Sequence, residues 1–369
     1  MKTHSFVCSA FVLLAASVSL LAAEPISVVP GGSVSNPRQP QAAVDENGVI
    51  YVAFGAGNAV YCCTSNDGGE TFGVPIKVGD VSKLALGMRR GPRIAASTDI
   101  VVITAISHDS GNVSAWRSTD GGAIWQGPVQ VNDSPNDARE GLHAMAMSST
   151  GDVYCTWLDL RHNGTQLFGA ASTDGGKTWS VNRPIYRSPD GSICECCHPA
   201  VTYDSKGGLY VMWRNALGGF RDIYGAVSRD GGKTFSAGGK LGTGSWKLDA
   251  CPMDGGYLAA AAPGKVTTVW RRDRQIFRTD SDRRGEQLLG TGEQPWTAAT
   301  TDGAYVVWLS GRDGDLWLAA PNVRQPSKLA SGATDPMLAA PITGQGPVVV
   351  VWETGSKRDP AVMAAVVAK

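Results

Sequence analysis

The sequence predicts an all-β fold assembled from repeated four-stranded units. Three observations indicate this fold: 46 glycines and 11 tryptophans along an even composition, one turn phrase repeated four times, and one strand pattern repeated seven times. Many glycines and tryptophans are typical of short strands joined by tight turns. No linker or charged block interrupts the chain, so we expect one repetitive domain.

The first 23 residues are typical of a secretory signal peptide. Lys2 precedes an uncharged run from Phe6 to Leu21, and Ala22 and Ala23 supply the small residues of a cleavage site. The apolar run is shorter than the roughly 20 residues that a membrane span needs. We therefore expect an exported protein, secreted or periplasmic, whose mature domain covers residues 24–369 and contains no membrane span.

The charge of the chain is balanced, with 33 basic and 33 acidic residues. Proteins that bind nucleic acid usually carry a basic patch or a strong excess of positive charge. The sequence shows neither feature, so we do not expect a nucleic-acid partner. We expect a monomer.

An Asp-Gly-Gly phrase recurs four times, each time with an aromatic residue five positions after the aspartate. The four aspartates are Asp67, Asp120, Asp174 and Asp230, at intervals of 53, 54 and 56 residues. In such a turn the carboxylate accepts hydrogen bonds from backbone N–H groups, and the glycines adopt left-handed backbone angles. We therefore interpret the phrases as structural turns.

An alternating strand that ends in a large residue marks each unit of the repeat. These residues are Phe54, Ile106, Trp157, Trp213, Trp270, Trp308 and Trp352. Because they recur at the same place in each unit, we interpret them as packing residues and not as ligand platforms.

The two ends of the mature chain each leave an incomplete unit. The seventh unit stops after its third strand, at residues 361–368, and residues 26–30 at the other end are typical of one more strand. Pairing the two ends would hide both exposed sheet edges. We predict a β-propeller of seven four-stranded blades, closed between its N- and C-terminal strands, with six blades as the alternative.

The Asp-Gly-Gly phrases, together with Arg38-Gln39-Pro40 at the start of the first unit, resemble the BNR or Asp-box repeat sialidase superfamily. The phrases cover residues 64–235, and the strand pattern extends the resemblance over the rest of the mature chain. The resemblance implies a β-propeller, usually six-bladed, that binds or hydrolyses an anionic glycan. An enzyme of this kind would be a glycoside hydrolase of exo-sialidase type. The alternatives are a metal-binding exported propeller and a non-catalytic interaction scaffold.

The resemblance also implies three arginines that hold a substrate carboxylate, because a guanidinium group binds a carboxylate through two parallel hydrogen bonds. The matching positions are Arg38, Arg214 and, for the third, Arg271 or Arg312. Two catalytic groups of the family lack a direct match. Residues 55–58, where the family carries an acid/base aspartate, contain no acid, and no tyrosine lies near the end of the domain. Tyr257, which opens an inner strand, is the geometric substitute for the nucleophile.

Seven cysteines remain in the mature chain, and an odd number means that at least one thiol is free, metal-bound or paired between chains. Five residues of ligand type fall in two links at one end of the units: Cys194, Cys196, Cys197, His198 and Cys251. Thiolates and imidazoles suit zinc or copper(I), whereas an oxidising compartment favours disulfides. We predict that Cys251 meets the Cys-x-Cys-Cys run, and leave open whether a disulfide or a metal joins them. No other cofactor is indicated.

Overall fold

A computed structural model describes residues 23–281, 285–356 and 358–369 of the chain. Strands dominate these residues, together with two short 3-10 helices, η1 (Pro30–Gly32) and η2 (Leu217–Gly219). The strands form six sheets in which neighbours along the chain pair antiparallel, so the prediction of an all-β fold with four-stranded sheets is confirmed. The predicted signal peptide lies, except for Ala23, outside the described residues.

Five sheets contain four strands each, taken in chain order. The first consists of β2 (Arg38–Val44), β3 (Ile50–Ala56), β4 (Ala59–Ser65) and β5 (Ile76–Asp80). The second consists of β6 (Arg93–Ala96), β7 (Val101–Ile106), β8 (Val113–Ser118) and β9 (Gln126–Gln130). The third consists of β10 (His143–Met147), β11 (Val153–Asp159), β12 (Gln166–Ser172) and β13 (Arg183–Tyr186). The fourth consists of β14 (Ala200–Tyr203), β15 (Leu209–Arg214), β16 (Ile223–Ser228) and β17 (Gly239–Lys240), and the fifth of β18 (Tyr257–Ala262), β19 (Lys265–Arg272), β20 (Gln275–Asp280) and β21 (Gln287–Thr291).

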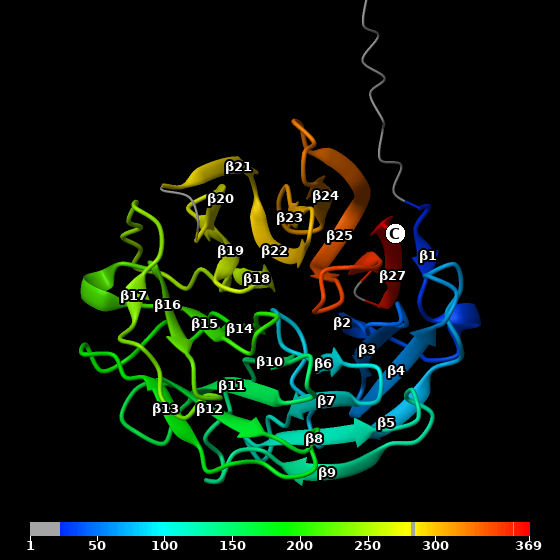
Figure 1. Cartoon of the computed structure of the whole chain (residues 1–369), viewed down its shortest axis with the longest axis horizontal. Helices are drawn as coiled ribbons and strands as arrows, with labels where there is room; N and C mark the ends of the chain where they lie inside the picture. The colour runs from blue at the N-terminus through cyan, green and yellow to red at the C-terminus, as the bar shows by residue number, and fades with distance from the viewer. Residues whose placement is uncertain (1–22, 282–284, 357) are drawn as a thin grey trace, which may run out of the picture.

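The sixth sheet contains seven strands and brings the two ends of the chain together. Its strands are β22 (Glu293–Thr300), β23 (Gly303–Leu309), β24 (Gly314–Ala319), β25 (Ser327–Ala339), β26 (Val348–Ser356), β27 (Asp359–Ala368) and β1 (Ile26–Ser27). The first half of β25 pairs with β24 and its second half with β26, so β25 belongs to two successive four-stranded units. At the far edge β1 pairs with β27, and Figure 1 shows these two strands side by side.

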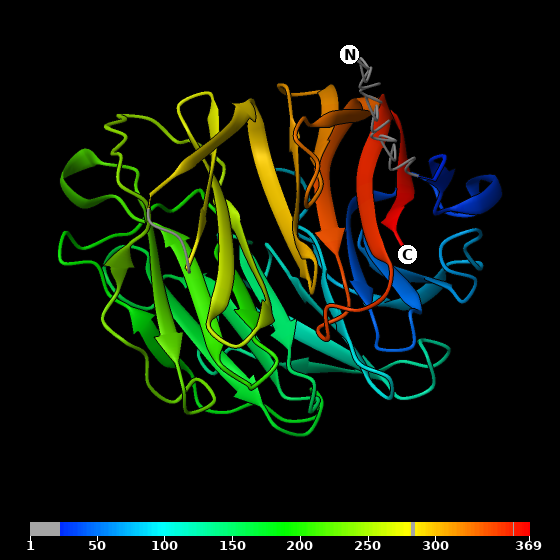
Figure 2. The same ribbon diagram turned by 45° about the horizontal axis from the view of Figure 1, so that its top comes forward.

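The first strands of successive units stand next to one another around a central channel (Figure 1). The channel is lined by residues of β2, β6, β10, β14, β18, β22 and the second half of β25, many of them alanines. Figure 2 shows the sheets ranged around this axis, with connecting loops at both ends. The arrangement is propeller-like, and the count of seven closed blades stays a prediction.

The Asp-Gly-Gly phrases form the turns between third and fourth strands. In the first of them, the Asp67 carboxylate accepts hydrogen bonds from the Thr71 hydroxyl and N–H, the Ser65 hydroxyl and the Glu70 N–H. The bond from the Thr71 hydroxyl contributes most to holding the pKa of Asp67 well below its usual range. The following glycines have φ angles of 72° and 85°, which suit residues without a side chain. This geometry is that of a structural turn.

The large residues at the ends of the second strands are all buried between neighbouring sheets. Phe54 and Trp157 are 0% exposed, and Trp308 is 3% exposed. Their interpretation as packing residues is therefore confirmed. No helix in the described residues is both long and apolar enough to cross a membrane.

Candidate functional site

A cleft of about 260 Å³ opens on the face where the links between units meet the loops that follow the second strands. Arg38 and Gln39 come from the start of β2, Gln294 from the start of β22, and Asp335 from the start of the second half of β25. The loop between β23 and β24 contributes Arg312, and the second half of β26 contributes Glu353. Both charged and neutral polar groups therefore line this cleft.

Two carboxyl groups in the cleft share one amide side chain. Gln39 Nε2 donates to Asp335 Oδ2 at 2.5 Å and to Glu353 Oε1 at 3.2 Å. The Gln39 backbone N–H donates to the same Glu353 oxygen at 2.5 Å. Gln294 Nε2 donates to Asp335 Oδ1 at 3.0 Å, and the backbone N–H of Asp335 donates to Gln294 Oε1. Four side chains from four different strands are thus fixed in one network.

The same backbone conformation orients three of these side chains. Gln39, Gln294 and Asp335 each precede a proline and have φ angles of 53°, 56° and 48°. The pairing register of their strands shifts at these positions. Bulges next to functional sites often redirect a side chain, and positive φ at residues other than glycine persists where surrounding contacts hold it. In three units of the repeat, one polar side chain is therefore directed into the cleft.

The electrostatics of the cleft favour a proton on Glu353. Burial and the negative charge of Asp335 raise the pKa of Glu353. Arg38 Nη1 lies 3.7 Å from Glu353 Oε2, and Arg89 Nε lies 3.8 Å from Asp335 Oδ1. Arg89 itself is buried and donates to the carbonyl oxygens of Pro336 and Gln294, each at 2.7 Å. The cleft thus holds an acidic pair between two guanidinium groups.

The predicted carboxylate-binding arginines separate into two groups. Arg38 and Arg312 line the cleft, and the side chain of Arg38 is 31% exposed. Arg271 lies outside the cleft lining, where its guanidinium contacts Glu293 at 3.1 Å and the Asp273 carbonyl at 2.7 Å.

Arg214 requires a correction. Its side chain is buried, and its three nitrogens donate to the carbonyl oxygens of Asp254, Arg221 and Arg271. A buried guanidinium group that donates from each of its three nitrogens to carbonyl oxygens inside the protein does not face an external carboxylate. Arg214 therefore holds links together, and the predicted three-arginine arrangement is not assembled in this structure.

Tyr257 also differs from its predicted role as a nucleophile. Its ring stacks on Trp296 with a centroid separation of 3.6 Å, and it lines the central channel. Burial raises the pKa of Tyr257 to about 12, which disfavours the phenolate. Within the described residues, its hydroxyl makes no hydrogen bond to a carboxyl group that would activate it. The geometry is that of a packing residue.

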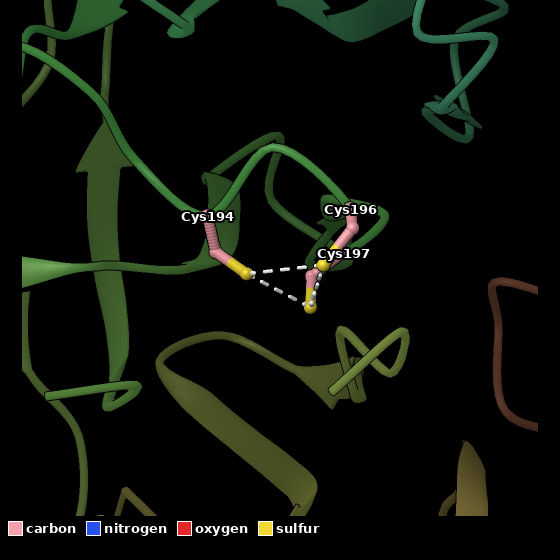
Figure 3. A group of neighbouring side chains, drawn as sticks. All are labelled: Cys194, Cys196 and Cys197. Carbon is pink, nitrogen blue, oxygen red and sulfur yellow. Dashed lines mark hydrogen bonds between the residues drawn. The ribbon is translucent and has the colours of Figure 1, made fainter. Parts of the chain in front are cut away.

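The predicted cysteine group comes together in the structure. Cys196 and Cys251 form a disulfide between the link into β14 and the link into β18. Cys194 and Cys197 are free thiols with their sulfurs 3.1 Å apart, next to Cys196 (Figure 3). The hydrogen bond with Cys197 lowers the pKa of Cys194 to about 7. Burial raises the pKa of Cys197.

His198, predicted as a ligand in this group, lies apart from the sulfurs. Its buried ring stacks on Trp296 with a centroid separation of 5.7 Å, and the clustered ligand atoms are those of the three neighbouring cysteines only. Both of its ring nitrogens lack a hydrogen-bond partner among the described residues. Burial holds the pKa of His198 well below its usual value, which favours the neutral ring.

Comparisons with known proteins agree with this architecture. Residues 96–269 match the BNR repeat-like domain family, a range that includes three of the four Asp-Gly-Gly turns. The resemblance to sialidase-like repeat proteins is therefore confirmed. The sequence has no match among curated proteins.

Three solved structures share the fold of this chain over most of its length. A protein of unknown function from Dyadobacter fermentans is 16% identical, with a TM-score of 0.56 over 93% of this chain and 97% of its own. The Hadza microbial sialidase Hz136 is 14% identical, with a TM-score of 0.51 over 86% of this chain and 73% of its own. A PL25 ulvan lyase is 12% identical, with a TM-score of 0.56 over 92% of this chain and 95% of its own. At these identities the comparisons show the fold alone.

The sequence patterns did not identify the cleft residues Gln294, Asp335 and Glu353, or the buried Arg89 next to Asp335. One signal was present in the sequence: a polar residue precedes a proline in three of the inner segments, as in Gln39-Pro40, Gln294-Pro295 and Asp335-Pro336. The burial of Arg89 and Glu353 has no comparable signal, because it depends on contacts between units far apart in the chain.

Proposed function

We propose that this protein binds an anionic glycan in the cleft bounded by Arg38, Arg312 and Glu353. The observation that carries the proposal is the network of two buried carboxyl groups held by glutamine amides and flanked by arginines. Arginines suit carboxylate or sulfate groups, and amide and carboxyl oxygens suit sugar hydroxyls. Among proteins of similar fold, Hz136 is a sialidase, and the PL25 lyase is bound to -[GlcA(1-4)Rha3S]-.

The cleft also contains the residue types that acid/base chemistry on a glycan requires. Enzymes commonly raise the pKa of one carboxyl group so that it donates a proton while a neighbouring carboxylate stays ionised. Burial and the charge of Asp335 raise the pKa of Glu353, so Glu353 fits the role of proton donor. Any cleavage of the bound glycan would use Glu353 in this role, and not Tyr257.

The proposal is tested by calorimetric titration of the full mature protein with matched glycans. An oligosaccharide with uronic acid, sialic acid or sulfate groups should bind, and its neutral counterpart should bind at least about tenfold more weakly because it lacks a charge-assisted contact. Equal affinity for both members of every pair, or no binding of any acidic glycan at millimolar concentration, would contradict the proposal.

The pH dependence of binding provides a prediction about Glu353. Its pKa is raised, so it loses its proton above the usual range of a glutamate, and the new negative charge lies next to Arg38 and the bound anion. Affinity for the anionic glycan should therefore rise as the pH falls through this pKa. Glu353→Gln should lose this dependence and keep, at high pH, the affinity that the wild type reaches only when Glu353 is protonated, because the amide carries no charge. Calorimetry at several pH values checks both expectations, and an unchanged pH profile in Glu353→Gln would assign the titration to another group.

We propose that the fold is a seven-bladed propeller closed by β1. The pairing of β1 with β27 and the double role of β25 support this count. Deleting residues 24–31 should expose the edge of β27, because Val28, which also bonds to Val362, is fully buried. We expect a lower melting temperature and association between chains, measured by calorimetry and light scattering. A truncated protein that stays monomeric at an unchanged melting temperature would contradict the closure.

We also propose export to the secreted or periplasmic space and function as a monomer. The support is the apolar run from Phe6 to Leu21 followed by Ala22 and Ala23. N-terminal sequencing of the protein recovered outside the cytoplasm should begin at Glu24. Recovery of the chain only inside the cytoplasm with its first residues intact would contradict export.

A further inference from the structure

The sulfurs of Cys194, Cys196 and Cys197 form a compact triangle. Their separations are 3.1 Å for Cys194 to Cys197, 3.7 Å for Cys194 to Cys196, and 4.0 Å for Cys196 to Cys197. Figure 3 shows the three side chains pointing toward one another from a single loop. The fourth sulfur, from Cys251, is bonded to that of Cys196 and arrives from the link into β18.

Two edges of this triangle, at 3.7 and 4.0 Å, are close to those of one face of a zinc site, and the third, at 3.1 Å, is shorter. In a tetrahedral site with Zn–S distances of about 2.3 Å, neighbouring sulfurs lie about 3.8 Å apart. Cys194 and Cys197 are each 1% exposed, which suits the closed environment of a structural site. Four sulfurs from two links would complete the usual set of four ligands once Cys196 and Cys251 are both thiolates.

The surroundings suit the charge of such a centre. Four thiolates around a zinc ion carry a net charge of minus two, which is costly to bury without cations nearby. Arg214 and Arg221 lie close enough to act on the Cys194 thiolate by their charge. Arg214 is itself buried and held by three carbonyl groups, so its position is fixed.

We propose that Cys194, Cys196, Cys197 and Cys251 form a tetrathiolate Zn²⁺ site when the Cys196–Cys251 disulfide is reduced. A dithiol reductant supplies two electrons and two protons, the S–S bond breaks, and the reductant becomes a disulfide. Zinc then binds as the four thiols release four protons and form four Zn–S bonds. The link into β14 and the link into β18 are thus joined either by a disulfide or by a metal ion. This site is separate from the proposed glycan cleft.

The test compares oxidised and reduced forms of the full mature protein, using Zn²⁺ alone as the probe. Under anaerobic conditions, the reduced protein should bind one Zn²⁺ per chain and gain thermal stability on binding. The oxidised protein retains two thiols in the cluster and should bind Zn²⁺ at least about 100-fold more weakly. Equal affinity of the two forms would overturn the proposal without the need for any variant.

Two variants assign the ligands. In the reduced state Cys197→Ser should bind Zn²⁺ at least about 100-fold more weakly, while Cys155→Ala, which changes a buried free cysteine in β11, should bind as the wild type does. Cobalt(II) substitution should give the intense thiolate-to-metal absorption of sulfur ligation in the wild type and in Cys155→Ala. Unchanged zinc affinity in Cys197→Ser, or loss of zinc binding in a folded Cys155→Ala, would contradict the assignment.

Discussion

Replacing Cys251 with serine is expected to lower the free energy of unfolding by about 4 kcal/mol, because the disulfide closes a loop between residues 55 positions apart and restricts the unfolded chain. The same substitution releases Cys196 as a thiol. Urea unfolding of the two proteins under non-reducing conditions, with a chelator present, measures the difference.

Reduction of the wild type supplies a control for the Cys251 substitution. Reduced, metal-free wild type should unfold at nearly the same urea concentration as Cys251→Ser, and a reductant should leave the stability of the variant unchanged. Alkylation of Cys251 in the native, unreduced protein would show that the disulfide is absent and would contradict the prediction.

Arg38→Ala is expected to weaken binding of an anionic glycan about 10- to 150-fold, because a charge-assisted hydrogen bond contributes about 1.5–3 kcal/mol. Arg38 lines the cleft, and its partly exposed guanidinium lies near Glu353. The measurement is calorimetric titration with the glycan that binds the wild type most tightly.

Arg324→Ala provides the matched control for Arg38→Ala, since Arg324 is exposed in the link that follows β24 and does not line the cleft. Its affinity should equal that of the wild type. Equal losses in the two variants would indicate a general effect of net charge, and no loss in Arg38→Ala would remove Arg38 from the binding site.

The repeat made the fold predictable. Asp67 and its three counterparts recur at nearly equal intervals, and each forms the same kind of turn, because local hydrogen bonds with nearby residues determine its shape. The buried residues Phe54, Trp157 and Trp352 likewise recur at equivalent positions. Local patterns of this kind need no knowledge of contacts between distant units.

The site was less predictable, because its chemistry depends on contacts between distant units. Gln39 bonds to Glu353 across 314 positions of sequence, and no local pattern encodes that pairing. Arg214 occupies a plausible loop position, yet it is buried and bonded to carbonyl groups from three different segments. Similarly, Tyr257 opens an inner strand as predicted, but stacking on Trp296 gives it a packing role.

Locating a bound anionic glycan by hydrogen–deuterium exchange tests the central claim most directly. The mature protein is compared with and without a saturating acidic oligosaccharide, and with its neutral counterpart as control. We predict slower exchange in the backbone amides around Gln39, Asp335 and Glu353, and unchanged exchange in the turn around Asp67 at the opposite end of the units. Protection confined to the Asp67 end, or none at all with a glycan that binds, would contradict a binding site in the cleft.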